Sequence, residues 1–489
     1  MKRFLAIDLG ASSGRGIVGE FDGEKINLCE VHRFDSAPAL LADGWHWDIA
    51  EILRQIKLAM KSAADKYGKD GIDSMGINSW GVDYGLIDKN GALLQLPFHY
   101  RDTRTDKYID EIHKIIPKRE LYGINGLQFM NFNTVYQLYA HIHESPYIKD
   151  AADCFLMIPQ LLGFFLTGKK CIEYTDASTT GLLDAKTRNW SDEIIERLGL
   201  PKKIFPEIVQ AGTVLGDIKP EIAEETGLDT KLVNVASHDT ASAFSAVPSV
   251  GLDSIFISSG TWSLMGVLLD EPNLSDGSFE INFTNEGNPE RKIRYLRNIM
   301  GTWLLQQSRR VWASAGNPMS FPEITEKAVN ATPFSAVIDV DYPVFGTMCD
   351  MPKEIVKYCE KIGQYVPKTE GEIARCICEG LALKYRDSVE KLEGLTGKKY
   401  DAIQIIGGGT QNKLICQMTA NACKKKVVTG PVEATAIGNI ALQIIASGEL
   451  QSVKEVGKVV AKSEVLCTYE PKDAEIWDKA YNKLLTLSK

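Results

Sequence analysis

The sequence predicts an α/β protein with two domains of comparable size. Residues 3–80 alternate apolar, strand-like runs with one amphipathic segment of helical spacing. A turn rich in glycine and hydroxyl residues lies between two apolar runs at residues 10–16, and a similar turn recurs at residues 260–266. At 489 residues, the chain is too long for one ordinary core and long enough for two large domains.

The first half of the chain predicts three strands, a helix and a further strand. The three strands are expected at residues 3–10, 14–21 and 25–34. Asp48, with Glu51 three residues later, predicts the start of the helix, and Gly68 predicts its end. The run "DSMGINSW" at residues 73–80 is then the fourth strand, and residues 105–200 look mainly helical.

The second half resembles the first in its order of elements. Aligning Gly10 with Gly260 also aligns Ser13 with Ser263, which is weak support for an internal repeat. Helices are expected at residues 301–313, 411–423 and 434–446, with strands at 400–409 and 425–430. We therefore place the domain boundary near residue 245, giving domains 1–245 and 246–489.

Composition excludes several classes of partner. The chain is 44% hydrophobic and 24% charged with a net charge of −9, and no stretch gathers enough Lys and Arg to bind nucleic acid. No apolar run reaches the ~18 residues of a membrane span, and the first residues lack a signal-peptide core. Ten cysteines without CxxC pairs predict reduced thiols and a cytoplasmic protein. His141 and His143, the tightest metal-like cluster, are interpreted as an exposed helix face.

One apparent phosphate-binding loop is a decoy. The run "GFFLTGKK", residues 163–170, has a lysine where a P-loop needs a hydroxyl, and bulky residues fill its middle. It is interpreted as a helix that ends at Gly168. The dinucleotide fingerprint also fails, because Ser12 stands where it requires glycine.

Three other segments are better candidates for nucleotide contacts. The turn "DLGASSGR" offers backbone amides, two hydroxyls and Arg15 to phosphate oxygens, while Asp8 could hold Mg²⁺ through water. The turn "SSGTWS" offers Thr261 and Ser263 in the same way, and "IIGGGTQN" ends a strand with three glycines. Each turn alone is more often a plain hairpin, but together they predict a nucleotide held between two domains.

A candidate catalytic acid lies in "VNVASHDTASAF", residues 233–244. His238, Asp239 and Thr240 stand between an apolar strand-like run and a small-residue helix-like run. A carboxylate at such a junction suits catalysis, and it equally suits a helix N-cap.

Taken together, the motifs resemble the FGGY carbohydrate kinases of the actin-like, ribonuclease-H-like ATPase superfamily. The resemblance rests on "DLGASSGR", "WGVDY", "YRDTRT", "ASHDTASA", "SSGTWSLMG", "NIMG" before "WLLQ", "GGGTQN" and "GPVEATAIGN", in order along nearly the whole chain. It implies two actin-like domains with a cleft between them, and transfer of the γ-phosphoryl group of MgATP to a sugar hydroxyl. The implied reaction converts L-rhamnulose to L-rhamnulose 1-phosphate, with L-fuculose or D-xylulose as alternative substrates and an ATPase switch without kinase activity as the less favoured reading.

The same resemblance implies the residues of the site. Asp239 would be the general base, with an ordinary pKa near ~3.9. Sugar contacts would come from Gly81, His238, Asp239, Thr240 and Asn298. ATP contacts would come from Ala11, Ser12, Ser13, Gly14, Arg15, Thr261, Gln306, Gly407, Gly408 and Gly409.

Several side chains keep two interpretations. His238 bonds a sugar hydroxyl or orients its loop, and Trp80 stacks on the sugar or belongs to the core. Asp83 is expected to accept sugar hydroxyls, whereas Asn298 has a turn position as its alternative. The partners implied are the sugar and MgATP, without nucleic acid or membrane, and the oligomeric state is left open.

Overall fold

The structure, a computed structural model, describes residues 1–248 and 251–487. The chain divides into two compact units. The first comprises Met1–Ser249, Leu268–Tyr295 and Ala434–Ser463, and the second comprises Val250–Val267, Leu296–Glu433 and Glu464–Lys489. Two segments from the second half of the chain therefore belong to the first unit. A single boundary near residue 245 does not describe this division. The assignment of sugar chemistry to residues 1–245 and nucleotide binding to residues 246–489 stays a prediction.

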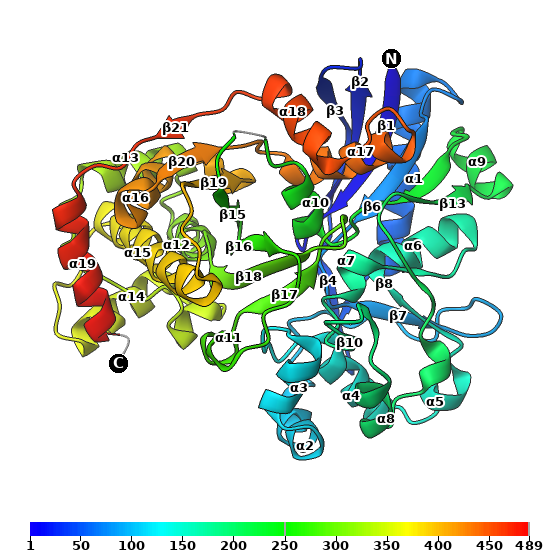
Figure 1. Cartoon of the computed structure of the whole chain (residues 1–489), viewed down its shortest axis with the longest axis horizontal. Helices are drawn as coiled ribbons and strands as arrows, with labels where there is room; N and C mark the ends of the chain where they lie inside the picture. The colour runs from blue at the N-terminus through cyan, green and yellow to red at the C-terminus, as the bar shows by residue number, and fades with distance from the viewer. Residues whose placement is uncertain (249–250, 488–489) are drawn as a thin grey trace. The chain divides into compact units, whose positions relative to one another are not determined.

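A six-stranded sheet is the framework of the first unit (Figure 1), in the order β13-β14-β6-β1-β2-β3. Its strands are β1 (Lys2–Leu9), β2 (Ser13–Phe21), β3 (Ile26–Asp35), β6 (Ser74–Asn78), β13 (Thr213–Asp217) and β14 (Lys231–Asn234). Strands β1, β2 and β3 pair antiparallel, whereas β6 runs parallel to both β1 and β14. Because parallel strands end at the same edge, the segments that follow β1, β6 and β14 meet there.

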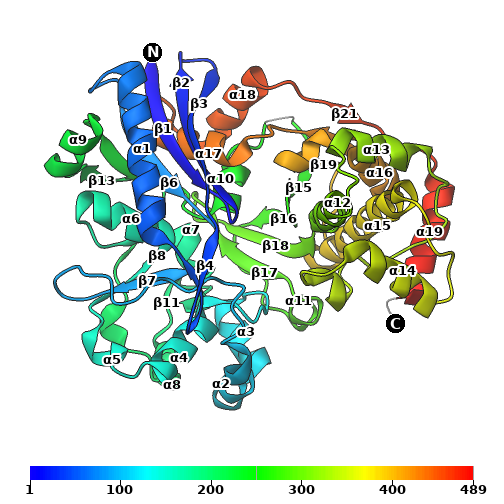
Figure 2. The same cartoon turned by 180° about the vertical axis from the view of Figure 1, so that it is seen from behind.

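Helix α1 (Ile49–Tyr67) covers one face of this sheet (Figure 2). It buries Ile52 and Ile56 in the same core as Leu5 of β1. The predicted start and stop are confirmed, since Asp48 accepts the N–H of Glu51 and the chain leaves the helix at Gly68 with φ of 88°. The capping box is only half formed, because the carboxylate of Glu51 pairs with Arg54 instead of returning to the cap.

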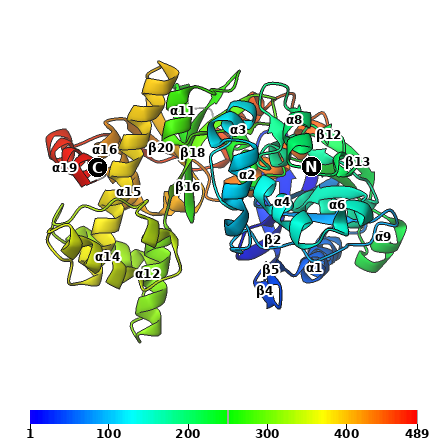
Figure 3. The ribbon, with the colours of Figure 1, turned by 90° about the horizontal axis from the view of Figure 1, so that it is seen from below.

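The predicted helical region is confirmed and has a core of its own. Its helices are α2 (Ile109–Ile115), α3 (Lys118–Asn125), α4 (Thr134–Glu144), α5 (Ile148–Ala151), α6 (Ile158–Thr167), α7 (Tyr174–Ala177) and α8 (Asp192–Arg197). Helices α2, α3 and α4 lie together in Figure 3 and share one apolar cluster with the paired strands β7 (Tyr84–Ile87) and β8 (Cys154–Met157). Small strands accompany them: β4 (Pro38–Leu41), β5 (Gly44–Trp47), β9 (Ile172–Glu173), β10 (Leu183–Asp184), β11 (Asn189–Trp190) and β12 (Ile208–Val209).

Two predictions about this region have opposite outcomes. Helix α6 ends at Gly168, whose φ is 78°, so the decoy loop is a helix stop as predicted. The exposed histidine face is wrong for His141, which is buried with ring nitrogens 3.1 Å from the Tyr84 hydroxyl and 2.9 Å from Gln95 Oε1. Burial lowers the pKa of His141 to about 3. Only its neighbour His143 is exposed.

The second sheet has the order β17-β18-β16-β15-β19-β20-β21. Its strands are β15 (Ser254–Ser259), β16 (Trp262–Leu269), β17 (Thr284–Gly287), β18 (Ile293–Met300), β19 (Ala402–Ile406), β20 (Lys426–Thr429) and β21 (Thr468–Tyr469). The antiparallel hairpin β15–β16 with β19 parallel to β15 repeats the arrangement of β1–β2 with β6. The internal repeat suggested by the glycine turns is therefore present in the topology.

Helices of the second unit follow the predicted order. They are α12 (Trp303–Ser314), α13 (Phe321–Asn330), α14 (Met351–Lys361), α15 (Glu370–Thr396), α16 (Lys413–Cys423) and α19 (Ala474–Leu487). The first unit holds the remaining helices, α9 (Pro220–Thr226), α10 (Asp239–Ser245), α11 (Asp276–Ile281), α17 (Ala434–Ala446) and α18 (Val453–Ser463). Helix α17 was expected from the sequence, but not its place beside β1, β6 and α10.

Helix α17 packs closely on α10 and bonds to the sheet. A Cβ atom at Gly438 would collide with the carbonyl oxygen of Ser242 in α10. One turn of α17 also donates to the sheet, from Asn439 Nδ2 to Asn78 Oδ1 (2.7 Å) and from Gln443 Nε2 to the carbonyl of Leu5 (3.1 Å). Glycine at 438 therefore allows α10 to lie at a fixed depth against a helix that is itself anchored to β1 and β6.

We predict that Gly438→Ala lowers the free energy of unfolding of the first unit by about 1–3 kcal/mol, because the added methyl overpacks a backbone contact. The matched control is Gly394→Ala at an exposed position of helix α15, where a Cβ meets no atom within 4 Å. That change should stabilise by about 0.5–1 kcal/mol. Urea denaturation followed by circular dichroism measures both, and equal effects of the two substitutions would contradict the packing argument.

Candidate active site

Asp239 begins helix α10, directly after the loop that follows β14. Its N–H donates to the carbonyl of Ser79 (2.8 Å), and the N–H of Ser79 donates to the carbonyl of Ser237 (2.8 Å). The N-cap position belongs to His238, while the carboxylate of Asp239 accepts from the N–H and the hydroxyl of Thr240. Asp239 is thus the first helical residue rather than the cap, and about a third of its side chain (34%) is exposed.

The pKa of Asp239 is higher than the ordinary aspartate value considered from the sequence. Burial raises its pKa to about 6, and the negative charge of Asp8 acts in the same direction, while the bonds from Thr240 oppose it. The exposed third of the side chain offsets part of that burial cost. A carboxylate with a pKa near 6 is a stronger base than an ordinary aspartate and is still ionised at neutral pH.

His238 is held by a buried ion pair from β17 and β18. Arg294 Nη2 donates to His238 Nδ1 (3.0 Å) and to Glu286 Oε2 (3.1 Å). The other ring nitrogen, Nε2, lies 3.4 Å from Asp239 Oδ1. Burial first, and then the charge of Arg294, lower the pKa of His238 well below its usual range, so the ring is neutral. Both interpretations of His238 remain possible, since it orients its loop and 11% of its side chain is exposed.

The segment after β6 brings Gly81 to the same edge of the sheet. A Cβ at Gly81 would lie 2.8 Å from Thr179 Oγ1, so a larger residue does not fit. The next residue, Val82, has φ of 68°, a strained value for a β-branched side chain. Thr179 Oγ1 accepts the N–H of Val82 (3.0 Å), and the hydroxyl of Thr134 donates to the carbonyl of Val82 (2.6 Å). Strain held in this way is common at ligand sites.

Asp83 does not have the role that the sequence suggested. It is fully buried, and Oδ2 accepts from the indole N–H groups of Trp47 (2.6 Å) and Trp80 (2.9 Å) and from the N–H of Tyr100 (3.1 Å). Oδ1 accepts from Gln137 Nε2 (2.8 Å). The two indoles stack with centroids 3.8 Å apart, and Trp80 is buried. Asp83 therefore anchors the loop instead of offering its oxygens to sugar hydroxyls, and Trp80 belongs to the core.

The first glycine turn presents an exposed stretch of backbone. Ala11 and Ser12 are exposed, Ser13 is partly buried, and a Cβ at Gly14 would collide with the Phe34 ring. Beside the turn, Arg15 Nη2 donates to Asp8 Oδ2 (2.7 Å). The turn thus has open amides and hydroxyls with a guanidinium next to them, as phosphate binding requires.

Asp8 is the candidate Mg²⁺ residue, and its surroundings favour a contact to Mg²⁺ through water. Oδ2 accepts from Arg15, and Oδ1 accepts from Asn78 Nδ2 (2.8 Å). Because both oxygens already accept a hydrogen bond, a hydrated Mg²⁺ held through water fits better than direct ligation. Across residues 1–248 and 251–487, no group of three or more His, Cys, Asp or Glu side chains could hold a metal ion. Mg²⁺ would therefore depend on nucleotide phosphates for its other ligands.

In the second unit, Thr261 and Gln306 lie together. Thr261 Oγ1 donates to Gln306 Oε1 (3.2 Å), and Gln306 Nε2 donates to Thr302 Oγ1 (3.0 Å). Thr302 in turn donates to the carbonyl of Gly260 (2.7 Å). Asn298 lies within strand β18, so the alternative of a turn position is wrong, and its sugar contact stays a prediction. Ser263 is buried and bonded to the Tyr385 hydroxyl (2.6 Å), which removes it as a phosphate contact.

The glycine run lies against the end of β15, the strand that leads to Thr261. A Cβ at Gly407 would lie 3.0 Å from the carbonyl oxygen of Ser259, and one at Gly409 would collide with the Ser259 hydroxyl. Gly407 has φ of 84°, and Gly408 faces open space. A short 3₁₀ turn, Gly408–Gln411, separates the run from α16, which begins two residues later than expected. The glycines thus leave bare backbone beside the second turn.

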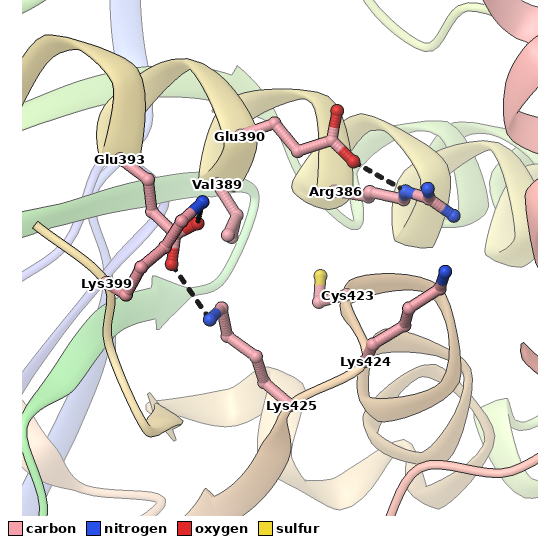
Figure 4. Close-up of a pocket in the computed structure, with 8 residues that line it drawn as sticks. All are labelled: Arg386, Val389, Glu390, Glu393, Lys399, Cys423, Lys424 and Lys425. Atoms are coloured by element: carbon pink, nitrogen blue, oxygen red, sulfur yellow. Dashed lines mark hydrogen bonds and ion pairs between the residues drawn. The ribbon is translucent and has the colours of Figure 1, made fainter. Parts of the chain in front are cut away.

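A hollow of about 490 Å³ in the second unit is not this site (Figure 4). It lies at the C-terminal end of α16, whereas the glycine run precedes the N-terminal end of that helix. Its cations are already paired: Lys399 and Lys425 with Glu393, and Arg386 with Glu390 and Asp478.

In the part of the chain that the structure describes, no helix is long and apolar enough to span a bilayer.

A partly exposed aspartate at the edge of one sheet, with a glycine-hydroxyl turn on each of two sheets of repeated topology, is an arrangement that phosphoryl transfer to a small alcohol can use. Residues 3–245 match the N-terminal domain of the FGGY family of carbohydrate kinases, and residues 255–447 match its C-terminal domain. The chain belongs to the FGGY family of carbohydrate kinases and is a carbohydrate kinase.

Individual relatives are similar over almost their whole length. A rhamnulokinase of Halalkalibacterium halodurans is 41% identical over 477 residues, covering 97% of this chain and 100% of the relative. A rhamnulokinase of Bacteroides thetaiotaomicron is 40% identical, with 98% of each chain covered. Among solved structures, a ligand-bound xylulose kinase from Lactobacillus acidophilus has a TM-score of 0.81 at 18% identity, covering 100% of this chain and 98% of its own. That likeness supports the fold, which is the actin-like α/β fold expected from the sequence.

Several residues of the site were not found from the sequence. Arg294 and Glu286 meet His238 from strands that follow it by some fifty residues, and Thr179 braces Gly81 from the helical region. No local pattern marks such contacts, since each depends on which strands become neighbours. Asp83 was singled out from the sequence as part of "WGVDY", but its partner Trp47 gave no signal.

We predict that Asp83→Asn lowers the free energy of unfolding of the first unit by about 1–3 kcal/mol, because the new amide leaves buried donors without an acceptor. The exposed helical residue Asp65 provides the control, and Asp65→Asn should be neutral within about 0.5 kcal/mol. Urea denaturation measures both. An Asp83→Asn protein as stable as the control would contradict the anchoring role.

Proposed function

We propose that the protein transfers the γ-phosphoryl group of ATP to the 1-hydroxyl of L-rhamnulose, giving L-rhamnulose 1-phosphate and ADP. The observation that carries the proposal is the placement of Asp239, a partly exposed carboxylate of raised pKa, beside His238 and bonded through its N–H to Ser79, two residues before Gly81. The choice of sugar is supported by relatives that are 35% to 41% identical over nearly their full length and are each named rhamnulokinase. With ten free thiols in the structure, we place the enzyme in the cytoplasm.

The proposed role of Asp239 is to accept the proton of the attacking hydroxyl. As the sugar oxygen forms its bond to the γ-phosphorus, the bond from that phosphorus to the bridging oxygen of ADP breaks, and the hydroxyl proton passes to the carboxylate. Gly81 lies in a loop that Thr179 braces too closely for a larger residue, and the Nε2 edge of His238 faces the carboxylate. Thr240 holds the carboxylate in one orientation.

The proposed nucleotide contacts come from both units. The exposed backbone of residues 11 and 12, the adjoining residues 13 and 14 and the guanidinium of Arg15 would bind phosphate oxygens, with Asp8 holding Mg²⁺ through water. Mg²⁺ neutralises the charge of the phosphates when it is bound. In the second unit, the Thr261 hydroxyl and the backbone at residues 407–409 would contact the nucleotide, with Gln306 orienting Thr261.

The substrate is tested by ADP release from MgATP with L-rhamnulose, L-fuculose, D-xylulose, glycerol or no sugar. We expect strong stimulation by L-rhamnulose and weak stimulation by the others. A preference for another ketose would overturn the choice of substrate while leaving the kinase class intact.

Asp239→Asn tests the proposed base. The variant should bind both substrates but lower kcat by about two orders of magnitude or more, the scale of a lost general base. Calorimetry that shows lost sugar binding, or near-normal turnover, would contradict that role.

We also predict an acid limb in kcat/KM for the sugar with an apparent pKa of about 6. Below that pH, Asp239 carries a proton and cannot accept another, so activity falls about tenfold per pH unit. Above it, the carboxylate is ionised and the rate reaches a plateau. Steady-state rates between pH 4.5 and pH 8, flanking that value by at least about one unit, provide the measurement. A limb near the ordinary aspartate value of ~3.9 would contradict the raised pKa.

A further inference from the structure

Arg294 is a buried cation whose charge acts on the candidate base, and no other part of the mechanism uses it. Its side chain is fully buried at the start of β18. Nε donates to the carbonyl of Gly287 (2.7 Å), and Nη2 donates to Glu286 Oε2 (3.1 Å) and His238 Nδ1 (3.0 Å). Three bonds from one guanidinium fix its plane, so its position relative to the histidine ring is set by the strand pair β17 and β18.

The contact between Arg294 and His238 determines where the ring carries its proton. A guanidinium can only donate, so Nδ1 must be the acceptor and cannot itself bear a proton. A neutral imidazole then carries its proton on Nε2. A protonated ring is disfavoured here by burial and by the neighbouring guanidinium. Glu286 Oε2 also lies near Nδ1, but its distance of 3.5 Å is longer than an ordinary hydrogen bond, so the 3.0 Å contact with Arg294 favours a neutral ring with its N–H at Nε2.

That N–H faces the base. Nε2 lies 3.4 Å from Asp239 Oδ1, longer than an ordinary hydrogen bond, and part of both side chains is exposed. The N–H can thus orient the carboxylate or a sugar hydroxyl that arrives beside it. The opposite tautomer would turn a lone pair toward a carboxylate and repel it. An imidazolium would form an ion pair with Asp239 and make it a weaker base.

We infer that Arg294 is a positioning residue for phosphoryl transfer, which holds His238 neutral with its proton on Nε2 so that this N–H aligns Asp239 and the sugar hydroxyl. The inference rests on the proposed function, in which Asp239 is the base. A buried ion pair such as Arg294 with Glu286 rarely adds net stability, so its presence calls for a role in specifying structure. Other charged groups that act on Arg294 are Glu173, Asp239 and the ionisable Tyr174, and Arg294 in turn acts on buried Asp176.

The tautomer is read directly by ¹⁵N NMR of the protein labelled at histidine, without sugar or nucleotide, with His238→Gln identifying the signals. We expect a protonated Nε2 and an unprotonated Nδ1 in the wild type. In the double variant Glu286→Gln/Arg294→Met, which removes both charges together, the ring should exchange between tautomers or gain a proton. A protonated Nδ1 in the wild type, or an unchanged tautomer in the double variant, would overturn the inference.

Kinetics separate positioning from a merely structural role. Glu286→Gln alone keeps the Arg294 donor and should change kcat by less than about threefold, whereas the double variant should lose about 10²-fold in kcat with a smaller change in sugar KM, the scale of a misplaced catalytic group. Arg294→Lys restores a cationic donor and should recover part of the loss. Equal kcat in Glu286→Gln and the double variant would overturn the inference.

The two arms distinguish this inference from the proposed function. The NMR result does not depend on the substrate, so its failure counts against Arg294 even if L-rhamnulose is phosphorylated. Failure of the substrate panel, with the tautomer as expected, counts against the proposed function.

Discussion

The parallel pairing of β6 with its neighbours is the constraint on which the site depends. It brings the ends of β1, β6 and β14 to one edge of the sheet, and with them Asp8, Gly81 and Asp239. Beyond the strands, the backbone bonds between Ser79 and the 237–239 loop continue that pairing by one residue. Main-chain hydrogen bonds therefore position Asp239 independently of its side-chain contacts. Burial at this edge, with a smaller contribution from the charge of Asp8, then raises the pKa of Asp239.

Helix α17 gives this edge its second support. Gly438 permits close packing on α10, and the amide chain Asn439–Asn78–Asp8 links α17 to the candidate Mg²⁺ residue. Amide side chains suit such a chain, because each has both a donor and an acceptor and none adds a charge. A helix near the end of the sequence thus supports both the candidate base Asp239 and the candidate Mg²⁺ residue Asp8. Helix α17, although distant in sequence, therefore affects the position of Asp8 through Asn78.

The sequence was informative where a requirement is local. Strand, turn and helix-stop signals located β1, β2, α1 and the end of α6, because Gly68 and Gly168 leave their helices in conformations that glycine favours. Family motifs indicated Asp239 and Gly81. The raised pKa of Asp239 was not expected from the sequence, since burial follows from packing that no local pattern encodes. His141 was misjudged for the same reason: its neighbours Tyr84 and Gln95 come from a different hairpin.

The buried charges of the first unit favour chemistry at the expense of stability. Burial raises the pKa of Asp83 and Asp239 to about 6 and that of Glu173 to about 7. A carboxyl group whose pKa is raised on folding stabilises the fold fully below its unfolded value, near ~4, and that contribution is lost as the pH rises through its folded value. Ionising these groups at neutral pH therefore costs folding free energy. Donors aimed at each carboxylate offset much of that cost for Asp83 and Glu173, which are structural. Asp239 has fewer such donors and remains partly exposed, so the uncompensated part of its charge is available to a substrate hydroxyl.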